Sequence, residues 1–92
     1  MALFKINMYF PDGYMQDLNK LRTAHLSYLK SQYNLHYGGI SLNEKEEYSC
    51  ILYIVDSPNK EDVIKFVEKD PYYALASRVD VESFIQKIPK LA

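Results

Sequence analysis

Apolar residues alternate with other residues at the beginning of the chain, and this two-residue period is typical of a β-strand. One side of the segment 3–10 is entirely apolar, with Phe4, Ile6, Met8 and Phe10. The other side mixes apolar and polar residues, including Leu3 and Tyr9. A Pro-Asp-Gly sequence at residues 11–13 then predicts that the strand ends in a turn.

The period changes between residues 14 and 32, where the residues of one mainly apolar face recur every three or four positions. This spacing predicts an α-helix with that face directed at the interior. The face contains Leu18, Leu21, Arg22, His25, Tyr28, Leu29 and Gln32. The opposite face of the helix is polar.

Two more strands are expected after this helix. The first, residues 35–42, contains Gly38 and Gly39, and paired glycines in a strand indicate a bulge or the close approach of another group. A polar turn at residues 43–47 separates it from the second strand, residues 48–55. This second strand is apolar on both faces, with Cys50, Leu52 and Ile54 on one side and Ile51, Tyr53 and Val55 on the other.

Ser57 followed by Pro58 predicts the start of a second helix, with the serine as its cap. Pro71 is expected to bend or end this helix, because the residue before a proline disfavours helical geometry. Alternation returns at residues 78–84 and predicts a last strand. The buried face of the second helix is expected to hold Val63, Ile64, Val67, Asp70 and Ala74.

The resulting order is β-α-β-β-α-β, which predicts an α+β fold with a four-stranded antiparallel sheet and both helices on one face. The first and third strands are expected to be central in the sheet. Since the third strand is apolar on both faces, another surface has to cover the side without helices. A second copy of the chain, in a two-fold homodimer, would do so. The alternative is a monomer with a partly apolar sheet face.

Composition narrows the class of protein. The 92 residues suffice for one domain, and 11 basic against 12 acidic residues argue against a nucleic-acid-binding surface. Cys50 is the only cysteine, which fits a reducing compartment. The first residues lack the pattern of a signal peptide, so a cytoplasmic protein without membrane contact is expected. We find no phosphate-binding loop, zinc motif or dinucleotide fingerprint, so no cofactor and no metal are predicted.

His25 and Asp70 both fall on faces predicted to be buried, and the residue pattern by itself favours a structural pair over a catalytic one. A buried histidine needs a hydrogen-bond partner, and a buried carboxylate needs a donor. If the two meet, the carboxylate orients the imidazole and leaves its other nitrogen free to act as a general base or acid. The alternative is a polar pair that only ties the two helices together.

Four other residues each have a functional and a structural interpretation. Arg22, one turn before His25, is a candidate ligand-binding residue for an anionic group, or else a salt bridge at the helix flank. Tyr72 is a second candidate ligand-binding residue, or else core packing. His36 has no second metal ligand at a suitable spacing and is interpreted as a surface or interface residue. Cys50 is expected in the core.

Three segments resemble the YCII-related family. Residues 21–26, Leu-Arg-Thr-Ala-His-Leu, are similar to its Arg-x-x-His-Leu stretch, and Gly39 stands where the family has a glycine. Residues 66–72, Phe-Val-Glu-Lys-Asp-Pro-Tyr, resemble its Phe-x-x-x-Asp-Pro-Tyr/Phe signature. With the order of elements, the likeness spans nearly all of the chain and identifies residues 1–92 as a single YCII-like domain.

The resemblance implies a dimeric α-β barrel built from two ferredoxin-like subunits, each with a cleft between helices and sheet. It also implies a possible enzyme with a histidine–aspartate pair, here His25 and Asp70, and the family is associated with dehydrochlorination of a chlorinated hydroxyquinol. We therefore expect proton-transfer chemistry of the lyase or isomerase type on a small polar or aromatic molecule. Two alternatives are a non-catalytic ligand-binding or regulatory homodimer, and a monooxygenase like those of other dimeric α-β barrels. The second is disfavoured because the chain has no tryptophan and no convincing haem-ligand histidine.

Overall fold

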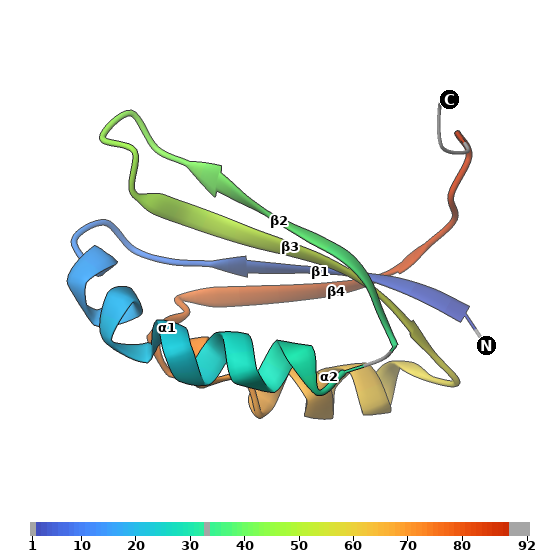
Figure 1. The fold of residues 1–92 in the computed structure, drawn as a ribbon. Helices are drawn as coiled ribbons and strands as arrows, with labels where there is room; N and C mark the ends of the chain where they lie inside the picture. Colours follow the sequence, from blue (N-terminus) through green and yellow to red (C-terminus); the bar gives the residue numbers. More distant parts are fainter. Residues whose placement is uncertain (1, 33, 89–92) are drawn as a thin grey trace.

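The computed structural model describes residues 2–32 and 34–88 of the chain. The strands form one antiparallel sheet in the order β2-β3-β1-β4, with both α-helices on one of its faces (Figure 1). This is the predicted ferredoxin-like α+β fold, with the first and third strands in the centre. Among the described residues, no helix has the length and apolar content to cross a membrane. The elements are β1 (Ala2–Tyr9), α1 (Met15–Lys30), β2 (Leu35–Leu42), β3 (Tyr48–Ser57), α2 (Lys60–Glu68), the short 3-10 helix η1 (Pro71–Leu75) and β4 (Arg78–Phe84).

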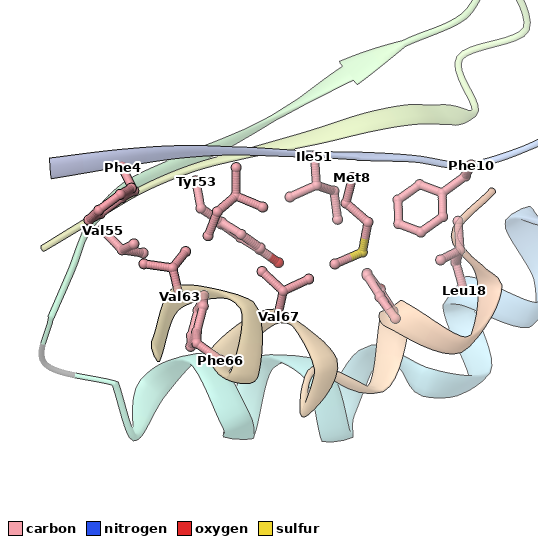
Figure 2. Close-up of a cluster of buried hydrophobic side chains, with 12 residues drawn as sticks. Phe4, Met8, Phe10, Leu18, Ile51, Tyr53, Val55, Val63, Phe66 and Val67 are labelled. Atoms are coloured by element: carbon pink, nitrogen blue, oxygen red, sulfur yellow. The ribbon is translucent and has the colours of Figure 1, made fainter. Parts of the chain in front are cut away.

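The core lies between the sheet and the helical layer. Alternate side chains of the strands point at the helices, and Figure 2 shows those of β1 and β3 meeting the apolar faces of α1 and α2. Burial of each large apolar side chain stabilises the fold by about 1.5–3 kcal/mol. The buried cluster is Phe4, Ile6, Met8, Phe10, Leu18, Ile51, Tyr53, Val55, Val63, Phe66, Val67 and Tyr72.

Helix α1 has the predicted orientation, with Leu18 and His25 buried. Arg22, assigned to the same face from its spacing, is exposed instead. A long side chain at the edge of a buried face can turn its charged end toward water, and the guanidinium gains hydration by doing so.

The start and the end of α2 differ from the prediction. Ser57 does not cap the helix, because it is the last residue of β3, and the side chain of Asn59 caps α2 by accepting a hydrogen bond from the Asp62 backbone N–H at 2.8 Å. The helix ends at Glu68, so Asp70 and Ala74 lie beyond it. Ile64 is 41% exposed and is not part of the buried face.

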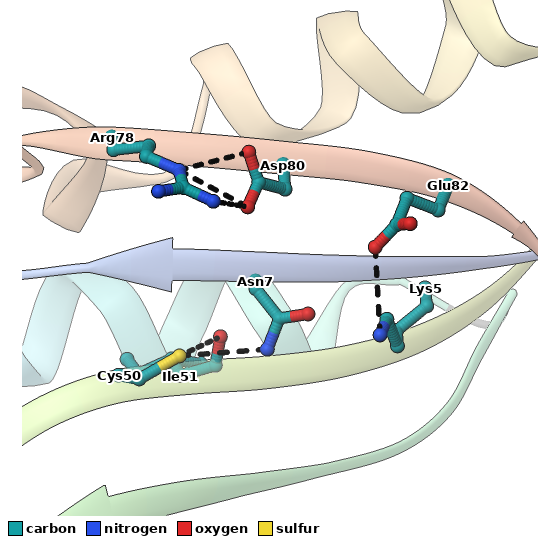
Figure 3. A network of polar contacts seen from close by, with 7 residues as sticks. All are labelled: Lys5, Asn7, Cys50, Ile51, Arg78, Asp80 and Glu82. Carbon is teal, nitrogen blue, oxygen red and sulfur yellow. Dashed lines mark hydrogen bonds and ion pairs between the residues drawn. The ribbon is translucent and has the colours of Figure 1, made fainter.

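The face of the sheet away from the helices is more polar than the pattern of β3 suggested. Lys5 of β1 lies 3.5 Å from Glu82 of β4, and Arg78 and Asp80 form an ion pair at 2.6 Å (Figure 3). Cys50 also lies on this face, half-buried, rather than in the core as predicted. Its sulfur accepts a hydrogen bond from the Asn7 amide at 3.5 Å.

The two glycines of β2 have different surroundings. A methyl group at Gly38 would lie 3.1 Å from Cδ1 of Tyr53 and 3.3 Å from the Leu52 carbonyl oxygen, whereas one at Gly39 would meet nothing within 4 Å. Gly38 therefore allows β2 to lie close against the Tyr53 ring. The irregularities of the β2–β3 register fall elsewhere, between Leu35 and Tyr37 and between Ser41 and Leu42.

Candidate functional site

Asp70 is at the centre of a buried hydrogen-bond network. Because α2 has already ended, this residue caps the short helix η1, and its Oδ1 accepts a hydrogen bond from the Tyr72 backbone N–H at 2.9 Å. The same oxygen lies 2.8 Å from Nδ1 of His25, and Oδ2 accepts a hydrogen bond from the Tyr53 hydroxyl at 2.9 Å. Three donors thus compensate a carboxylate that is 2% exposed.

His25 reaches this carboxylate from α1. The imidazole is 5% exposed and lies flat against the Tyr72 ring, with ring centres 3.8 Å apart and planes 6° apart. An ionised carboxylate can only accept, so the hydrogen of the short contact belongs to Nδ1 of His25. In the neutral imidazole this leaves the lone pair on Nε2.

Nε2 of His25 remains open to a further partner. It makes no hydrogen bond with another described residue, yet no fully buried side-chain nitrogen or oxygen in the described part of the chain lacks a partner. The His25 side chain as a whole keeps 6% of its surface exposed. The imidazole lines a cleft of about 380 Å³ between α1 and the β2 edge of the sheet. The lining residues are His25, Leu26, Leu29, Leu35, Gly38, Gly39, Ile40, Ile51 and Tyr53.

The cleft is apolar apart from two groups. None of its lining residues is a lysine, arginine, aspartate or glutamate, so the polar atoms that a ligand meets are those of His25, Tyr53 and the backbone. Burial, and then the neighbouring charge of Asp70, raise the pKa of the Tyr53 hydroxyl far above its usual range. This hydroxyl therefore stays protonated and serves as a hydrogen-bond donor.

The structure brings His25, Asp70 and Tyr72 together, and Arg22 lies outside this contact. Tyr72 is 1% exposed and packs against His25, so its ring supports the imidazole and is not part of the cleft lining. Burial, and then Tyr48, raise the pKa of the Tyr72 hydroxyl, while the charge of Arg22 opposes this. Arg22 is thus near the Tyr72 hydroxyl and is not part of the cleft lining.

Tyr53 is a member of the site that the sequence pattern did not single out. The alternation grouped Tyr53 with Ile51 and Val55 on one face of β3 but did not say which face meets the helices, and the structure shows that it is this one. The available signal was the hydroxyl itself, because a tyrosine in an apolar core needs a partner for it. A second buried polar residue, Asp70, was already expected on the same side of the sheet.

The described residues contain no group of three or more histidine, cysteine, aspartate or glutamate side chains arranged to hold a metal ion. His36 is exposed, as its interpretation as a surface residue requires, and its Nε2 lies 3.7 Å from Asp56.

No family model matches the sequence, and no curated protein is similar to it at the sequence level. The structure is similar to that of 5-chloro-2-hydroxyhydroquinone dehydrochlorinase from Burkholderia phenoliruptrix, solved with 2,5-dihydroxybenzoquinone. The two chains are 25% identical with a TM-score of 0.80, and the match covers 90% of this chain and 93% of the other.

Two more distant structures share the fold. A putative antibiotic biosynthesis monooxygenase from Bacteroides thetaiotaomicron is 9% identical with a TM-score of 0.58, covering 99% of this chain and 93% of the other. A hypothetical protein from Pyrococcus horikoshii is 17% identical with a TM-score of 0.54, covering 95% and 93%. These two likenesses, like that to the dehydrochlorinase, show the ferredoxin-like fold of the chain.

Proposed function

We propose that this protein is a YCII-like enzyme of the lyase or isomerase type, in which His25 and Asp70 act as a catalytic dyad. The observation that supports the proposal is the 2.8 Å contact between His25 Nδ1 and the buried Asp70 carboxylate, on a histidine that also lines the cleft. In this assignment His25 touches the substrate and Asp70 acts through His25.

The chemistry follows from the protonation state of the imidazole. Nε2 of neutral His25 removes a proton from a hydroxyl group or an acidic carbon of the substrate. In an elimination, the electron pair left behind forms a new double bond while the leaving group departs with its own bonding electrons. Asp70 stabilises the imidazolium that results, and the flat stack of Tyr72 holds the ring in place.

The cleft favours a small, flat, hydroxylated ring. Its walls are mainly aliphatic, and no lining residue carries a positive charge that would bind a carboxylate or a phosphate. A hydroxyl of such a ring can bind to Nε2 of His25 while its apolar edge packs against residues such as Leu29 and Ile40. The bound 2,5-dihydroxybenzoquinone of the structurally similar dehydrochlorinase has this chemical character.

Arg22 and Tyr72 keep supporting roles in the proposal. Tyr72 acts from behind the imidazole by packing, and Arg22 provides positive charge near the Tyr72 hydroxyl, where it can attract an anionic substrate toward the site. Neither side chain is required to touch the substrate within the cleft.

The proposal includes a homodimer, with residues 1–92 as a single YCII-like domain in each subunit and the two sheets facing each other in a dimeric α-β barrel. Leu52 and Cys50 of β3 lie half-buried on the face without helices, flanked by the ion pairs of β1 and β4. A second copy would cover these side chains and could pair with the charged groups around them.

The test uses 5-chloro-2-hydroxyhydroquinone as the probe and measures the release of chloride. We expect turnover by the wild type, and a loss of about 100-fold or more for His25→Ala, which is the usual contribution of a general base. The matched control is His36→Ala, since His36 is the other histidine of the chain and is exposed. Turnover by His25→Ala at the wild-type rate would exclude the dyad.

The alternative is a ligand-binding or regulatory homodimer that uses the same cleft without catalysis. The apolar lining supports it, because such a cleft binds a flat ring whether or not a reaction follows. Calorimetric binding of 2,5-dihydroxybenzoquinone without any turnover of the chlorinated probe would favour this alternative.

A further inference from the structure

We propose that Tyr53 is a positioning residue that fixes the Asp70 carboxylate and moderates its attraction for the proton of His25. The inference deepens the proposed function and rests on it, since it assigns a task to a third residue of the same site. Tyr53 belongs to the sheet, whereas His25 and Asp70 belong to the helical layer.

The geometry gives Tyr53 a place that no other described residue shares. The two other donors to the carboxylate, His25 Nδ1 and the Tyr72 backbone N–H, both bond to Oδ1. Oδ2 receives its hydrogen bond from the Tyr53 hydroxyl at 2.9 Å. With both oxygens held by donors, the plane of the carboxylate is fixed relative to the imidazole.

Tyr53 is itself held in one position. Its ring is 2% exposed, and Gly38 lies opposite it in the register of β2 and β3. A methyl group at Gly38 would approach Cδ1 of the ring to 3.1 Å, so a larger residue there requires the ring or the strand to move by a few tenths of an ångström. The edge of Phe66 contacts the ring from the helical layer, with centres 6.0 Å apart and planes at 71°. These contacts direct the hydroxyl at Asp70.

One side chain thus contacts both the cleft and the carboxylate. The ring of Tyr53 lines the cleft beside His25, and its hydroxyl bonds to the carboxylate that lies behind His25. A ligand that packs against the ring therefore touches the group that orients the dyad.

The direction of the effect follows from the chemistry of the hydrogen bond. A donor to a carboxylate stabilises its negative charge, so the carboxylate attracts the Nδ1 proton of the imidazolium less strongly. Without the Tyr53 hydroxyl, Oδ2 would be left without this donor in a buried site. Asp70 would then stabilise the imidazolium more strongly, and His25 would remain protonated to a higher pH.

The experiment is a proton and nitrogen NMR titration of the His25 ring in the wild type, Tyr53→Phe and Tyr28→Phe. Tyr28 of α1 is the matched control, because its hydroxyl also donates a hydrogen bond within the domain, but to the Phe66 carbonyl at 2.8 Å. We expect Tyr53→Phe to raise the midpoint of the His25 titration by about 0.5–1 pH unit, and Tyr28→Phe to leave it within experimental error. An unchanged or lowered midpoint in Tyr53→Phe would overturn the proposal.

A second variant covers the case in which Tyr53→Phe does not fold. Gly38→Ala places a methyl group 3.1 Å from Cδ1 of the Tyr53 ring without removing the hydroxyl, and we expect it to push the ring and shift the midpoint in the same direction. No shift there would also overturn the proposal. Because the titration uses the resting protein, it gives an answer even if the chlorinated probe is not a substrate. In that event the proposed reaction fails while the role of Tyr53 stands or falls on its own data.

Discussion

The negative charge of Asp70 is the feature of the candidate site expected to affect His25 most, and Asp70→Asn removes this charge with little change in the shape of the side chain. The amide oxygen can still accept from His25 Nδ1 and the Tyr72 backbone N–H, and its NH₂ group can donate to the Tyr53 hydroxyl oxygen. The substitution therefore tests the negative charge and keeps the set of contacts. Asp70→Ala, in contrast, would leave three buried donors without their acceptor.

The contact distance sets the size of the effect. With Nδ1 and Oδ1 2.8 Å apart, the centres of charge of the imidazolium and the carboxylate are about 4 Å apart, which corresponds to about 4 kcal/mol at an effective dielectric constant near 20. Part of this attraction is retained as a dipole in the asparagine. An opposite charge at this range changes a titration by about 1–3 pH units. We therefore expect the midpoint of His25 to fall by about 1–3 pH units in Asp70→Asn.

The assay is an NMR titration in which the second histidine serves as an internal reference. His36 lies on β2, and its nearest carboxylate is that of Asp56 at 3.7 Å, so its midpoint should not respond to the substitution. In the same samples, Asp70→Asn should lower the rate of any turnover that depends on His25. A His25 midpoint that moves no more than that of His36 would refute the coupling on which the dyad depends.

Three further outcomes follow from the described contacts. Gly38→Ala should lower the free energy of unfolding, measured in urea, by about 1–3 kcal/mol through overpacking against Tyr53. Gly39→Ala, whose methyl group would meet nothing within 4 Å, should lower it far less. Equal losses in the two variants would contradict this reasoning. The raised pKa of Tyr53 contributes stability that is fully present below about pH 10 and is lost above it. Between pH 10 and 12, unfolding free energy should therefore fall less steeply in Tyr53→Phe, by up to about 1.4 kcal/mol per pH unit; equal slopes would exclude the effect. Leu52→Lys, on the sheet face without helices, should convert the homodimer into a monomer of 10.8 kDa, as measured by light scattering. The control Glu61→Lys, on the exposed side of α2, should leave the homodimer intact. A wild-type protein that is already monomeric would contradict the dimer.

Alternation predicted β1 and β4, while the apolar faces of β3 and the glycine-containing segment before its polar turn predicted β3 and β2. The bounds predicted for β2 and β4 match the structure, and β1 is displaced by a single residue. In β1 the apolar face is buried and the other face carries Lys5 and Asn7, so a shift of one residue would bury polar groups. The pattern of apolar residues along a strand therefore indicates which of its side chains the folded sheet buries.

The helix ends were harder to predict because they depend on local hydrogen bonds. Ser57 has the right residue type for a cap, but pairing with Ala2 extends β3 to this residue, and Asn59 then becomes the first free side chain able to cap α2. The environment of Asp70 was also predicted from periodicity and is also set by local hydrogen bonds. Its burial was predicted from helical periodicity, and the structure buries it for another reason, as the cap of η1.

The pairing of His25 with Asp70 could be proposed but not measured from the sequence. Periodicity gives the direction of a side chain and contains no distance between residues 45 positions apart. The resemblance to a known motif supplied the pairing, and the structure supplies the 2.8 Å contact. Arg22 illustrates the opposite case, since correct spacing on a helix did not prevent a long charged side chain from turning to solvent.

The network around Asp70 joins three separate parts of the chain: α1, the central strand β3 and the link between α2 and η1. A cleft built from such distant segments exists only when the whole domain is folded, so binding energy gained there adds to global stability. A ligand at 100 times its dissociation constant would add about 2.7 kcal/mol. For a domain of this size, each kcal/mol raises the melting temperature by about 4–8 °C. A thermal-shift screen of hydroxylated aromatic compounds can therefore find the natural ligand of this cleft without any assay of turnover.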